Sequence, residues 1–184
     1  MPATKLKHAV ENLILVDPHD QPIGKMEKIL THEYAMLHRA FSVFIFRENK
    51  GRKELLLQQR NPAKYHAGGL WTNTCCGHPH PREGLVKSAQ KRLKEEMGFE
   101  AKLEDIGKFH YVAQFENGLV ENEIDHVLIG CYAANQIPFN TAEVENYRWI
   151  DIAVLQKELK AKPKKFTPWF PQALALALSS EQTL

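Results

Sequence analysis

The sequence predicts an α+β protein in which a mixed central β-sheet is flanked by helices. Residues 40–47 (AFSVFIFR) carry apolar side chains on both faces of an extended segment, which is typical of a central strand covered on both sides. Residues 85–97 repeat apolar side chains every four positions, as an amphipathic helix does. Residues 143–150 (EVENYRWI) are expected to form a last strand that leads into another helix. A strand that is apolar on both faces must be buried by other elements, and helices with one apolar face can bury it, so together they predict this architecture.

Composition places the chain among soluble globular proteins. Its 184 residues are enough for one domain with a hydrophobic core, and we expect residues 1–184 to form a single domain. The net charge of +2 and the lack of a long basic run argue against nucleic acid as a partner. No apolar run reaches membrane length, and the first residues lack a signal-peptide core. Three cysteines, two of them adjacent, form no disulfide framework, so we expect a cytoplasmic protein, and nothing requires more than a monomer.

The strand predictions rest on short apolar or aromatic runs bounded by turn residues. Turns are indicated by the polar, Pro-containing run at 17–22, by Asn-Lys-Gly at 49–51 and by Gly118. Strands are therefore expected at residues 11–16, 24–30, 40–47, 54–59, 109–115, 121–132 and 143–150.

Two of the predicted helices have recognisable ends. The helix over 85–97 should end at Gly98, where a left-handed C-terminal cap is expected. A second helix should run from a cap at Asp151 to Lys160, and residues 166–169 should open a C-terminal helix.

Two charged residues of the helix over 85–97 lie at or near its apolar side. By helical phase Glu96 projects toward that side, and Arg92 lies one turn earlier at its margin. A carboxylate aimed at the core must be paired or must bind a metal. The alternative is an Arg92–Glu96 pair on a solvated flank, and helical phase alone leaves both open.

The segment from Gly77 to Phe99 resembles a degenerate Nudix box, whose pattern is G-x5-E-x7-R-E-U-x-E-E-x-G-U with U a bulky apolar residue. The positions that match are Gly77, Glu83, Leu93, Glu95, Glu96, Gly98 and Phe99. Lys91 replaces the Arg of the pattern, and Arg92 replaces a Glu. A Nudix hydrolase needs that carboxylate to bind the metal that activates water. A cation there suits holding a diphosphate without cutting it.

The flanking motifs are more specific. The run W-T-N-T-C-C-G-H-P at 71–79 and E-N-E at 121–123 resemble type I isopentenyl-diphosphate isomerases, and the resemblance covers residues 27–169. It implies an α/β/α Nudix-type fold and the interconversion of isopentenyl and dimethylallyl diphosphate in isoprenoid biosynthesis. It also implies a small-molecule diphosphate as the partner of the site.

The resemblance implies a metal site of three imidazoles and two carboxylates: His32, His38, His78, Glu121 and Glu123. Spacing alone is a weak signal, although two glutamates two apart share one strand face and repel unless a cation lies between them. Mixed nitrogen and oxygen ligands favour Mn²⁺ or Zn²⁺. A second site, with Glu96 and the backbone carbonyl of Cys76, would suit Mg²⁺. The other histidines have no such support and are expected to be ordinary: His8, His19, His66, His80, His110 and His126.

The resemblance also assigns substrate contacts to Lys28, Arg60, Lys64, Arg92 and Trp169. Arginine can fork onto phosphate oxygens, and an indole face can stabilise a cation. From the residues alone, Lys28 is equally an exposed strand charge, and Trp169 a core side chain.

The implied reaction needs an acid and a base on either side of an allylic unit. The resemblance implies Cys76 on one face and Glu123, aided by Tyr111, on the other, without deciding which protonates first. Cys75 is a rival to Cys76, because neighbours in an extended segment face opposite ways. Two other classes stay open: a Nudix-type diphosphohydrolase and a binding module without turnover.

Overall fold

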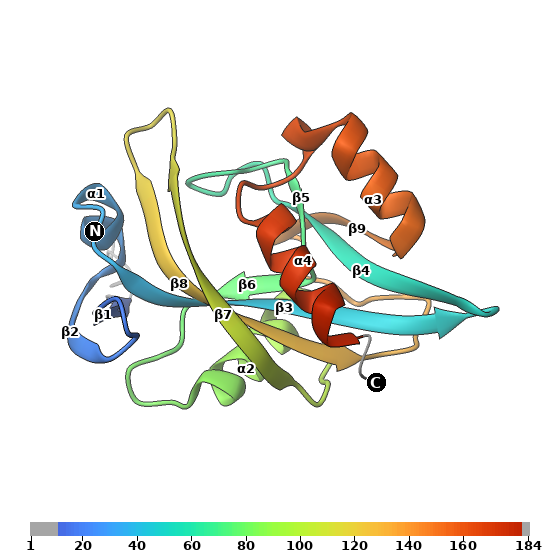
Figure 1. The fold of residues 1–184 in the computed structure, drawn as a ribbon, viewed down its shortest axis with the longest axis horizontal. Coiled ribbons are helices and arrows are strands. Elements are labelled where there is room, and N and C mark those ends of the chain that lie inside the picture. The colour runs from blue at the N-terminus through green and yellow to red at the C-terminus, as the bar shows by residue number, and fades with distance from the viewer. Residues whose placement is uncertain (1–10, 182–184) are drawn as a thin grey trace, which may run out of the picture.

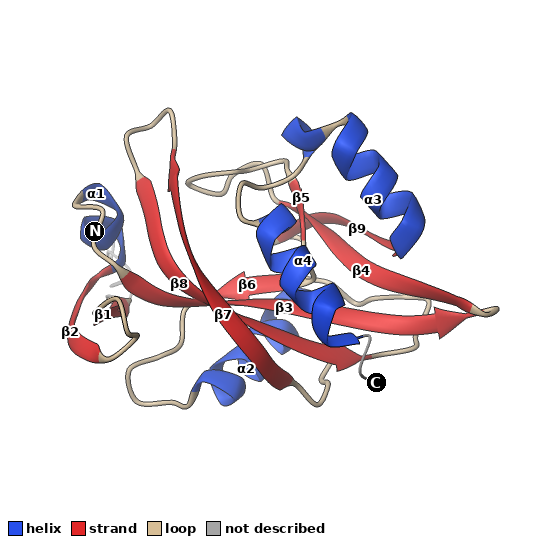
Figure 2. Ribbon diagram, viewed as in Figure 1, coloured by secondary structure: helices blue, strands red, loops and turns tan. Residues whose placement is uncertain are grey.

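The computed structural model describes residues 11–181. Its strands join in one sheet, and its helices lie around that sheet (Figure 2). The strands are β1 (Asn12–Val16), β2 (Pro22–Glu27), β3 (His38–Asn49), β4 (Arg52–Arg60), β5 (Trp71–Thr72), β6 (Cys75–Gly77), β7 (Glu104–Gln114), β8 (Val120–Cys131) and β9 (Val144–Asp151). The helices are α1 (Lys28–Glu33), α2 (Leu85–Met97), α3 (Ile152–Ala161) and α4 (Phe170–Glu181), with a 3-10 turn at Pro163–Lys165.

Strand β3 is the centre of the sheet. It pairs in parallel with β8 and antiparallel with β4, β6 and β1. Strand β7 extends the sheet beyond β8, β9 extends it beyond β4, and β2 pairs with β1. The mixed sheet predicted from the sequence is therefore confirmed.

The two faces of β3 bury two different cores, as its apolar alternation predicts. Phe41, Val43 and Ile45 pack with the apolar side of α2 on one face. Phe44 and Phe46 pack with α3 and α4 on the other. Figure 1 shows α4 in front of the sheet and α2 behind it. Since each fully buried aromatic or aliphatic side chain contributes roughly 1.5–3 kcal/mol, β3 links the two layers energetically as well as topologically.

The predicted helix ends are confirmed. Gly98 closes α2 with φ at +76°, and a Cβ at this position would lie 2.2 Å from the carbonyl oxygen of Pro138, so only glycine fits. The Asp151 side chain accepts the backbone N–H of Val154 at 3.1 Å and caps α3.

The strand predicted over 24–30 is too long. Strand β2 ends at Glu27, whose carboxylate accepts the backbone N–H of Leu30 at 3.0 Å and so caps α1. Lys28 is consequently the first residue of a helix and not a strand residue. Residues 24–30 alternate as a strand does, and this periodicity conceals the local helix start that the glutamate cap marks.

The C-terminal helix also begins later than expected, at Phe170. The segment before it is extended, because Phe166 forms an isolated parallel bridge with Trp71 and Thr167 donates its N–H to the Trp71 carbonyl.

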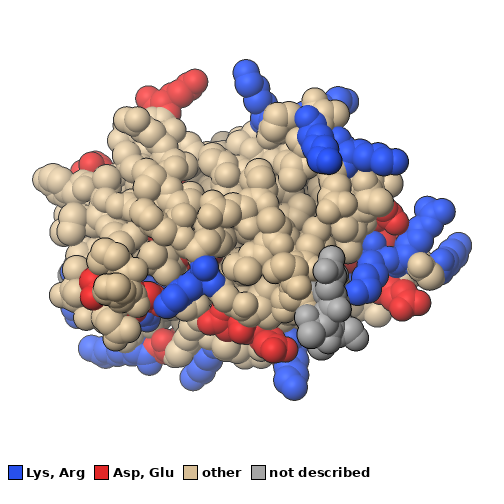
Figure 3. All heavy atoms as spheres, in the orientation of Figure 1, with Lys and Arg blue, Asp and Glu red and all other residues tan. Residues whose placement is uncertain are grey.

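No helix within residues 11–181 is both long enough and apolar enough to span a membrane. On the face shown in Figure 3, positive and negative side chains lie along the margins, and the middle is largely uncharged.

Candidate active site and metal centre

A cavity of about 490 Å³ lies where β3, β6, β8, α2 and the β4–β5 loop meet. Residues far apart in the chain line it, from Glu11 to Trp169. The predicted catalytic and substrate-contacting residues all lie on its wall: Lys28, Arg60, Lys64, Cys76, Arg92, Tyr111, Glu123 and Trp169. The fold thus brings the predicted groups to one place.

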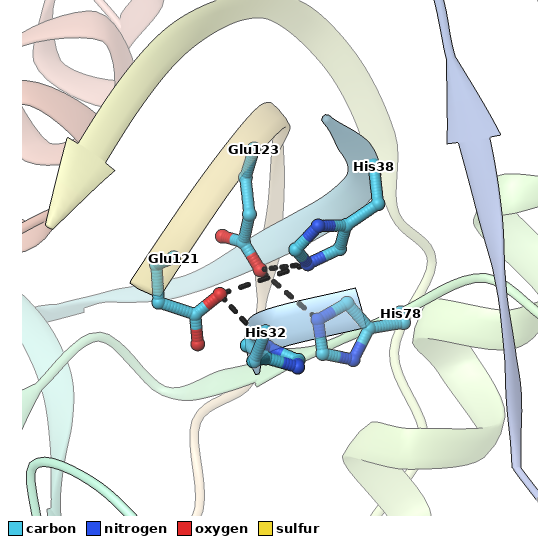
Figure 4. Close-up of side chains that lie close together, drawn as sticks. All are labelled: His32, His38, His78, Glu121 and Glu123. Atoms are coloured by element: carbon cyan, nitrogen blue, oxygen red, sulfur yellow. Dashed lines mark hydrogen bonds and ion pairs between the residues drawn. The ribbon is translucent and has the colours of Figure 1, made fainter. Parts of the chain in front are cut away.

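Five predicted ligands converge at one end of this cavity (Figure 4). One ligand atom from each lies within 4.8 Å of all the others. The topology explains this, because His38 and Glu123 are direct partners in the parallel β3–β8 pair, and His78 follows β6, which also pairs with β3. Helix α1 adds His32, and Glu121 stands on the same face of β8 as Glu123.

The histidines are oriented as metal ligands would be. Nδ1 of His32 lies 2.5 Å from the Lys28 carbonyl, and Nδ1 of His38 lies 2.8 Å from the Met36 carbonyl. A carbonyl can only accept, so each Nδ1 carries a hydrogen and each Nε2 faces the cluster, where its lone pair could bind a metal ion. Nε2 of His38 is buried and has no hydrogen-bond partner within the described residues. These residues therefore fit a divalent metal ion, which would satisfy the nitrogen and the two carboxylates together.

The pKa shifts of Glu121 and His38 also indicate that the cluster fits a positively charged ion. Burial would raise the pKa of Glu121, but close contacts with the ring nitrogens of His32, His38 and His66 hold that pKa well below its usual range. Burial would lower the pKa of His38, but its contacts with Glu121 and Glu123 raise it to about 10. Two buried carboxylates demand positive charge, which a proton on His38 supplies when a metal does not.

The two oxygens of each carboxylate in the cluster contact different partners. Oε1 of Glu123 lies 3.0 Å from Nε2 of His78 and 3.3 Å from Nε2 of His38. Its Oε2 accepts a hydrogen bond from the Tyr111 hydroxyl. Burial and the adjacent Glu123 raise the pKa of Tyr111 well above 10, so the phenol stays a donor.

The two oxygens of Glu121 also contact different partners, and one of these partners, His66, was not predicted from the sequence. Oε2 of Glu121 faces His32 at 3.0 Å, and its Oε1 lies 2.5 Å from Nε2 of His66. The expectation that His66 is an ordinary histidine is wrong, because its side chain is buried against the metal centre. Its position in the same loop as Arg60 and Lys64 was the available signal, and no spacing rule connects it to Glu121.

The two neighbouring cysteines face different environments. Cys75 is fully buried in the core between β3 and α2, whereas Cys76 lines the cavity. The Cys76 thiol lies 3.2 Å from Oδ1 of Asn73 and 3.9 Å from Oγ of Ser42. Burial, with the nearby Asp125, raises the pKa of Cys76 to about 12, so the thiol is protonated at neutral pH. A protonated thiol in a cavity is able to act as an acid.

A group of cations and carboxylates lies beside the thiol. Arg92 contacts Oε1 of Glu96 at 2.6 Å and Oε2 of Glu143 at 2.8 Å. Lys64 forms an ion pair with Glu143 and lies 3.9 Å from Glu96. The Arg92–Glu96 pair therefore exists, but Glu96 is only 3% exposed and lines the cavity, so the solvated-flank alternative is wrong.

Arg60, Lys28 and Trp169 complete the wall. The Arg60 guanidinium lies 5.5 Å from the centre of the Trp169 ring. Lys28 contacts Glu11 at 2.9 Å and lies 5.3 Å from the centre of the Tyr65 ring. Trp169 is 4% exposed, and its indole N–H donates to Oδ1 of Asn73, the same oxygen that accepts from Cys76.

Comparison with known proteins gives consistent relatives. The NUDIX domain family model matches residues 36–170. The isopentenyl-diphosphate Delta-isomerase of Burkholderia multivorans is 49% identical over 160 residues, covering 87% of this chain and 89% of the relative. That of Photobacterium profundum is 44% identical and covers 92% and 95%.

Solved structures agree on the fold. The MutT protein of Methanosarcina mazei superposes with a TM-score of 0.60 at 20% identity, covering 78% of this chain and 95% of that protein. A NUDIX hydrolase from Nitrosomonas europaea gives a TM-score of 0.55 at 17% identity, covering 77% and 88%. At these identities the likeness concerns the fold alone.

Proposed function

Because the chain belongs to the isopentenyl-diphosphate Delta-isomerase family of NUDIX proteins, we propose how its cavity carries out that family's reaction. The enzyme interconverts isopentenyl diphosphate and dimethylallyl diphosphate. The observation that carries the proposal is that a half-buried thiol, a Tyr-bonded carboxylate and an indole line one cavity with five Lys and Arg side chains.

The cations would hold the diphosphate. Arg60 and Arg92 supply planar guanidinium groups that can fork onto phosphate oxygens, and Lys28 and Lys64 supply point charges. Glu143 and Glu96 balance two of these cations, so a bound diphosphate would compete with carboxylates that are already in place. Glu96 and the carbonyl of Cys76 would hold Mg²⁺ next to the diphosphate, which offsets the added negative charge.

His32, His38, His78, Glu121 and Glu123 would hold the other divalent ion, Mn²⁺ or Zn²⁺. When bound, that ion would stabilise the two carboxylates in one orientation and lower their affinity for protons. The proton transfers themselves would be carried out by side chains of the protein.

The reaction moves one proton onto the alkene and removes one from the carbon on the other side of the cationic centre. Protonation of the terminal carbon gives a tertiary carbocation, and loss of a proton from the neighbouring methylene gives the internal alkene. Cys76 and Glu123 would perform these two transfers, with Tyr111 holding Glu123. Trp169 would present its π face to the cation.

The proposal is tested by proton NMR of isopentenyl diphosphate with the protein, Mg²⁺ and Mn²⁺ in D₂O. Appearance of dimethylallyl diphosphate containing deuterium supports it. Release of phosphate without isomerisation would favour a diphosphohydrolase, which the cation at Arg92 disfavours. Metal uptake without turnover would favour a binding module.

The role of Cys76 has a matched control within the chain. Cys76→Ala should abolish deuterium uptake almost completely, by about 10²–10⁴-fold in rate. Cys131→Ala removes an exposed thiol at the end of β8 and should change nothing. Equal rates in the two variants would refute the assignment of the thiol.

A further inference from the structure

His66 is held rigidly beside the metal centre by two segments. Its ring stacks on Phe115, with centroids 4.6 Å apart and planes 16° apart, and meets Tyr65 edge-on at 4.3 Å. The Asn117 amide donates to the Tyr65 carbonyl at 2.7 Å, so the tip of the β7–β8 hairpin is tied to the β4–β5 loop. The ring therefore has a defined direction, and its side chain is only 4% exposed.

Nε2 of His66 lies next to Oε1 of Glu121, the carboxylate oxygen that is not in contact with the other histidines. Oε2 of Glu121 lies 3.0 Å from His32 and 3.6 Å from His38, on the cluster side. Oε1 lies 2.5 Å from Nε2 of His66. The two atoms form an ion-pair contact, and both side chains are excluded from water. Neither ring nitrogen of His66 has a hydrogen-bond partner within the described residues, so Oε1 of Glu121 is the acceptor that lies within reach of Nε2.

The second carboxylate of the cluster shows what such a partner does. Glu123 turns Oε1 to the histidines and gives Oε2 to Tyr111. Glu121 turns Oε2 to the histidines and gives Oε1 to His66. Each carboxylate thus has one oxygen toward the metal position and the other against a buried aromatic donor.

We propose that His66 is a positioning residue that donates its Nε2–H to Oε1 of Glu121 and so restricts Glu121 to one oxygen at the metal. The inference rests on the metal centre proposed above. Groups that orient metal ligands commonly change metal affinity by about 10- to 100-fold when removed. The backbone carbonyl of His66 accepts from the Arg60 guanidinium at 3.3 Å, so the same residue ties the loop of Arg60 and Lys64 to the metal centre.

The test is a titration of the metal-free protein with Mn²⁺, in which electron paramagnetic resonance measures the free and bound ion. His66→Phe keeps a ring to stack on Phe115 but has no donor. It should weaken Mn²⁺ binding by about 10- to 100-fold and alter the spectrum of the bound ion. His66→Gln restores a side-chain N–H and should recover most of the affinity. The matched control is His110→Phe, because His110 is exposed on β7 and contacts Asn122, and it should bind like the wild type.

Three outcomes would overturn the inference. Equal affinity and an unchanged spectrum in His66→Phe would remove His66 from the metal centre. Loss of affinity in His66→Gln as large as in His66→Phe would show that packing matters and the donor does not. A wild-type protein that binds no Mn²⁺ would refute the metal centre itself. If circular dichroism shows His66→Phe unfolded, His66→Asn, which is too short to reach Glu121, takes its place under the same criteria.

Discussion

Two clusters of histidine and carboxylate lie on opposite faces of the same pair of strands. His38 of β3 and Glu123 of β8 belong to the proposed metal centre, on the face that carries α4 further along. Arg39 of β3 and His126 of β8 point to the other face, where they meet Asp20 from the β1–β2 turn. Strand alternation separates the two clusters.

The difference between them is their charge balance. Asp20 accepts from Arg39 at 2.7 Å, from Lys108 at 2.7 Å and from His126 at 2.9 Å. The other nitrogen of His126 lies 2.9 Å from Asp105. Two carboxylates here meet two permanent cations and an imidazole, so this cluster satisfies itself. We refer to it as the Asp20 cluster.

The metal centre has no such balance. Its two carboxylates contact four imidazoles, those of His32, His38, His66 and His78, and form no ion pair with Lys or Arg among the described contacts. Nε2 of His38 has no hydrogen-bond partner there. A buried group of charges that lacks its counter-charge is stable only when something binds. The comparison is consistent with a stabilising role for the Asp20 cluster and with the proposal that the other cluster holds a metal ion.

The largest expected effect is on the metal centre. His38→Ala should remove the tightly bound metal and slow isomerisation by about 10²–10⁴-fold, because Glu123 loses its orientation. Metal content measured by inductively coupled plasma mass spectrometry, beside the NMR rate, checks this. Unchanged metal content would disprove the ligand assignment.

Metal binding should stabilise the protein through this cluster alone. Mn²⁺ at 100 times its dissociation constant should add about 2.7 kcal/mol to the free energy of unfolding. Urea titrations with and without the ion measure the difference. Asp20→Asn should keep the full increment, and His38→Ala should lose it. An increment that persists in His38→Ala would mean that the ion binds elsewhere.

In contrast to the metal centre, the Asp20 cluster should affect stability and leave activity unchanged. Asp20→Asn should lower the free energy of unfolding by about 2 kcal/mol, since two cations and an imidazole lose a buried charged partner. Isomerase activity at 25 °C should stay at the wild-type level. Glu116→Gln, a change at an exposed glutamate, is the control for removing one negative charge. A large loss of activity without loss of stability would contradict the structural role.

The smallest effect is on acid stability. Burial tends to raise the pKa of Asp20, but hydrogen bonds from Lys108, Arg39 and His126 lower it, and the pKa of Asp105 is also lowered. Their stabilising contribution is therefore complete above the unfolded value of about 3.9 and is lost as the pH falls through the folded pKa. Urea midpoints of the metal-free proteins between pH 6 and pH 3 should fall more steeply for wild type than for Asp20→Asn. Parallel curves would show that Asp20 titrates alike in both states.

Local sequence patterns predicted much of the fold. The two apolar faces of β3, the buried side of α2 and the caps at Gly98 and Asp151 all follow from residues within a few positions of one another. The same holds for Glu121 and Glu123, whose common face is a consequence of the two-residue period of a strand. Helical phase placed Glu96 toward the apolar side of α2 but left a solvated pair with Arg92 open, and the tertiary structure decided that Glu96 is buried.

Other features depended on contacts between distant segments. Glu143 meets Lys64 and Arg92 only because β9 pairs with β4. His126 was expected to be ordinary and proves to be part of the Asp20 cluster, although nothing connects the two residues in sequence.

The sequence by itself determined most of the strands and helices, which way they face, and the motifs that mark the family, because these depend on backbone period and residue type. Only the tertiary structure decided that His66 meets Glu121, that Cys76 lines the cavity while Cys75 lies in the core, and that the Asp20 cluster is satisfied. Those outcomes depend on strand order and register, which set distances between residues tens of positions apart and leave no periodic trace in the chain.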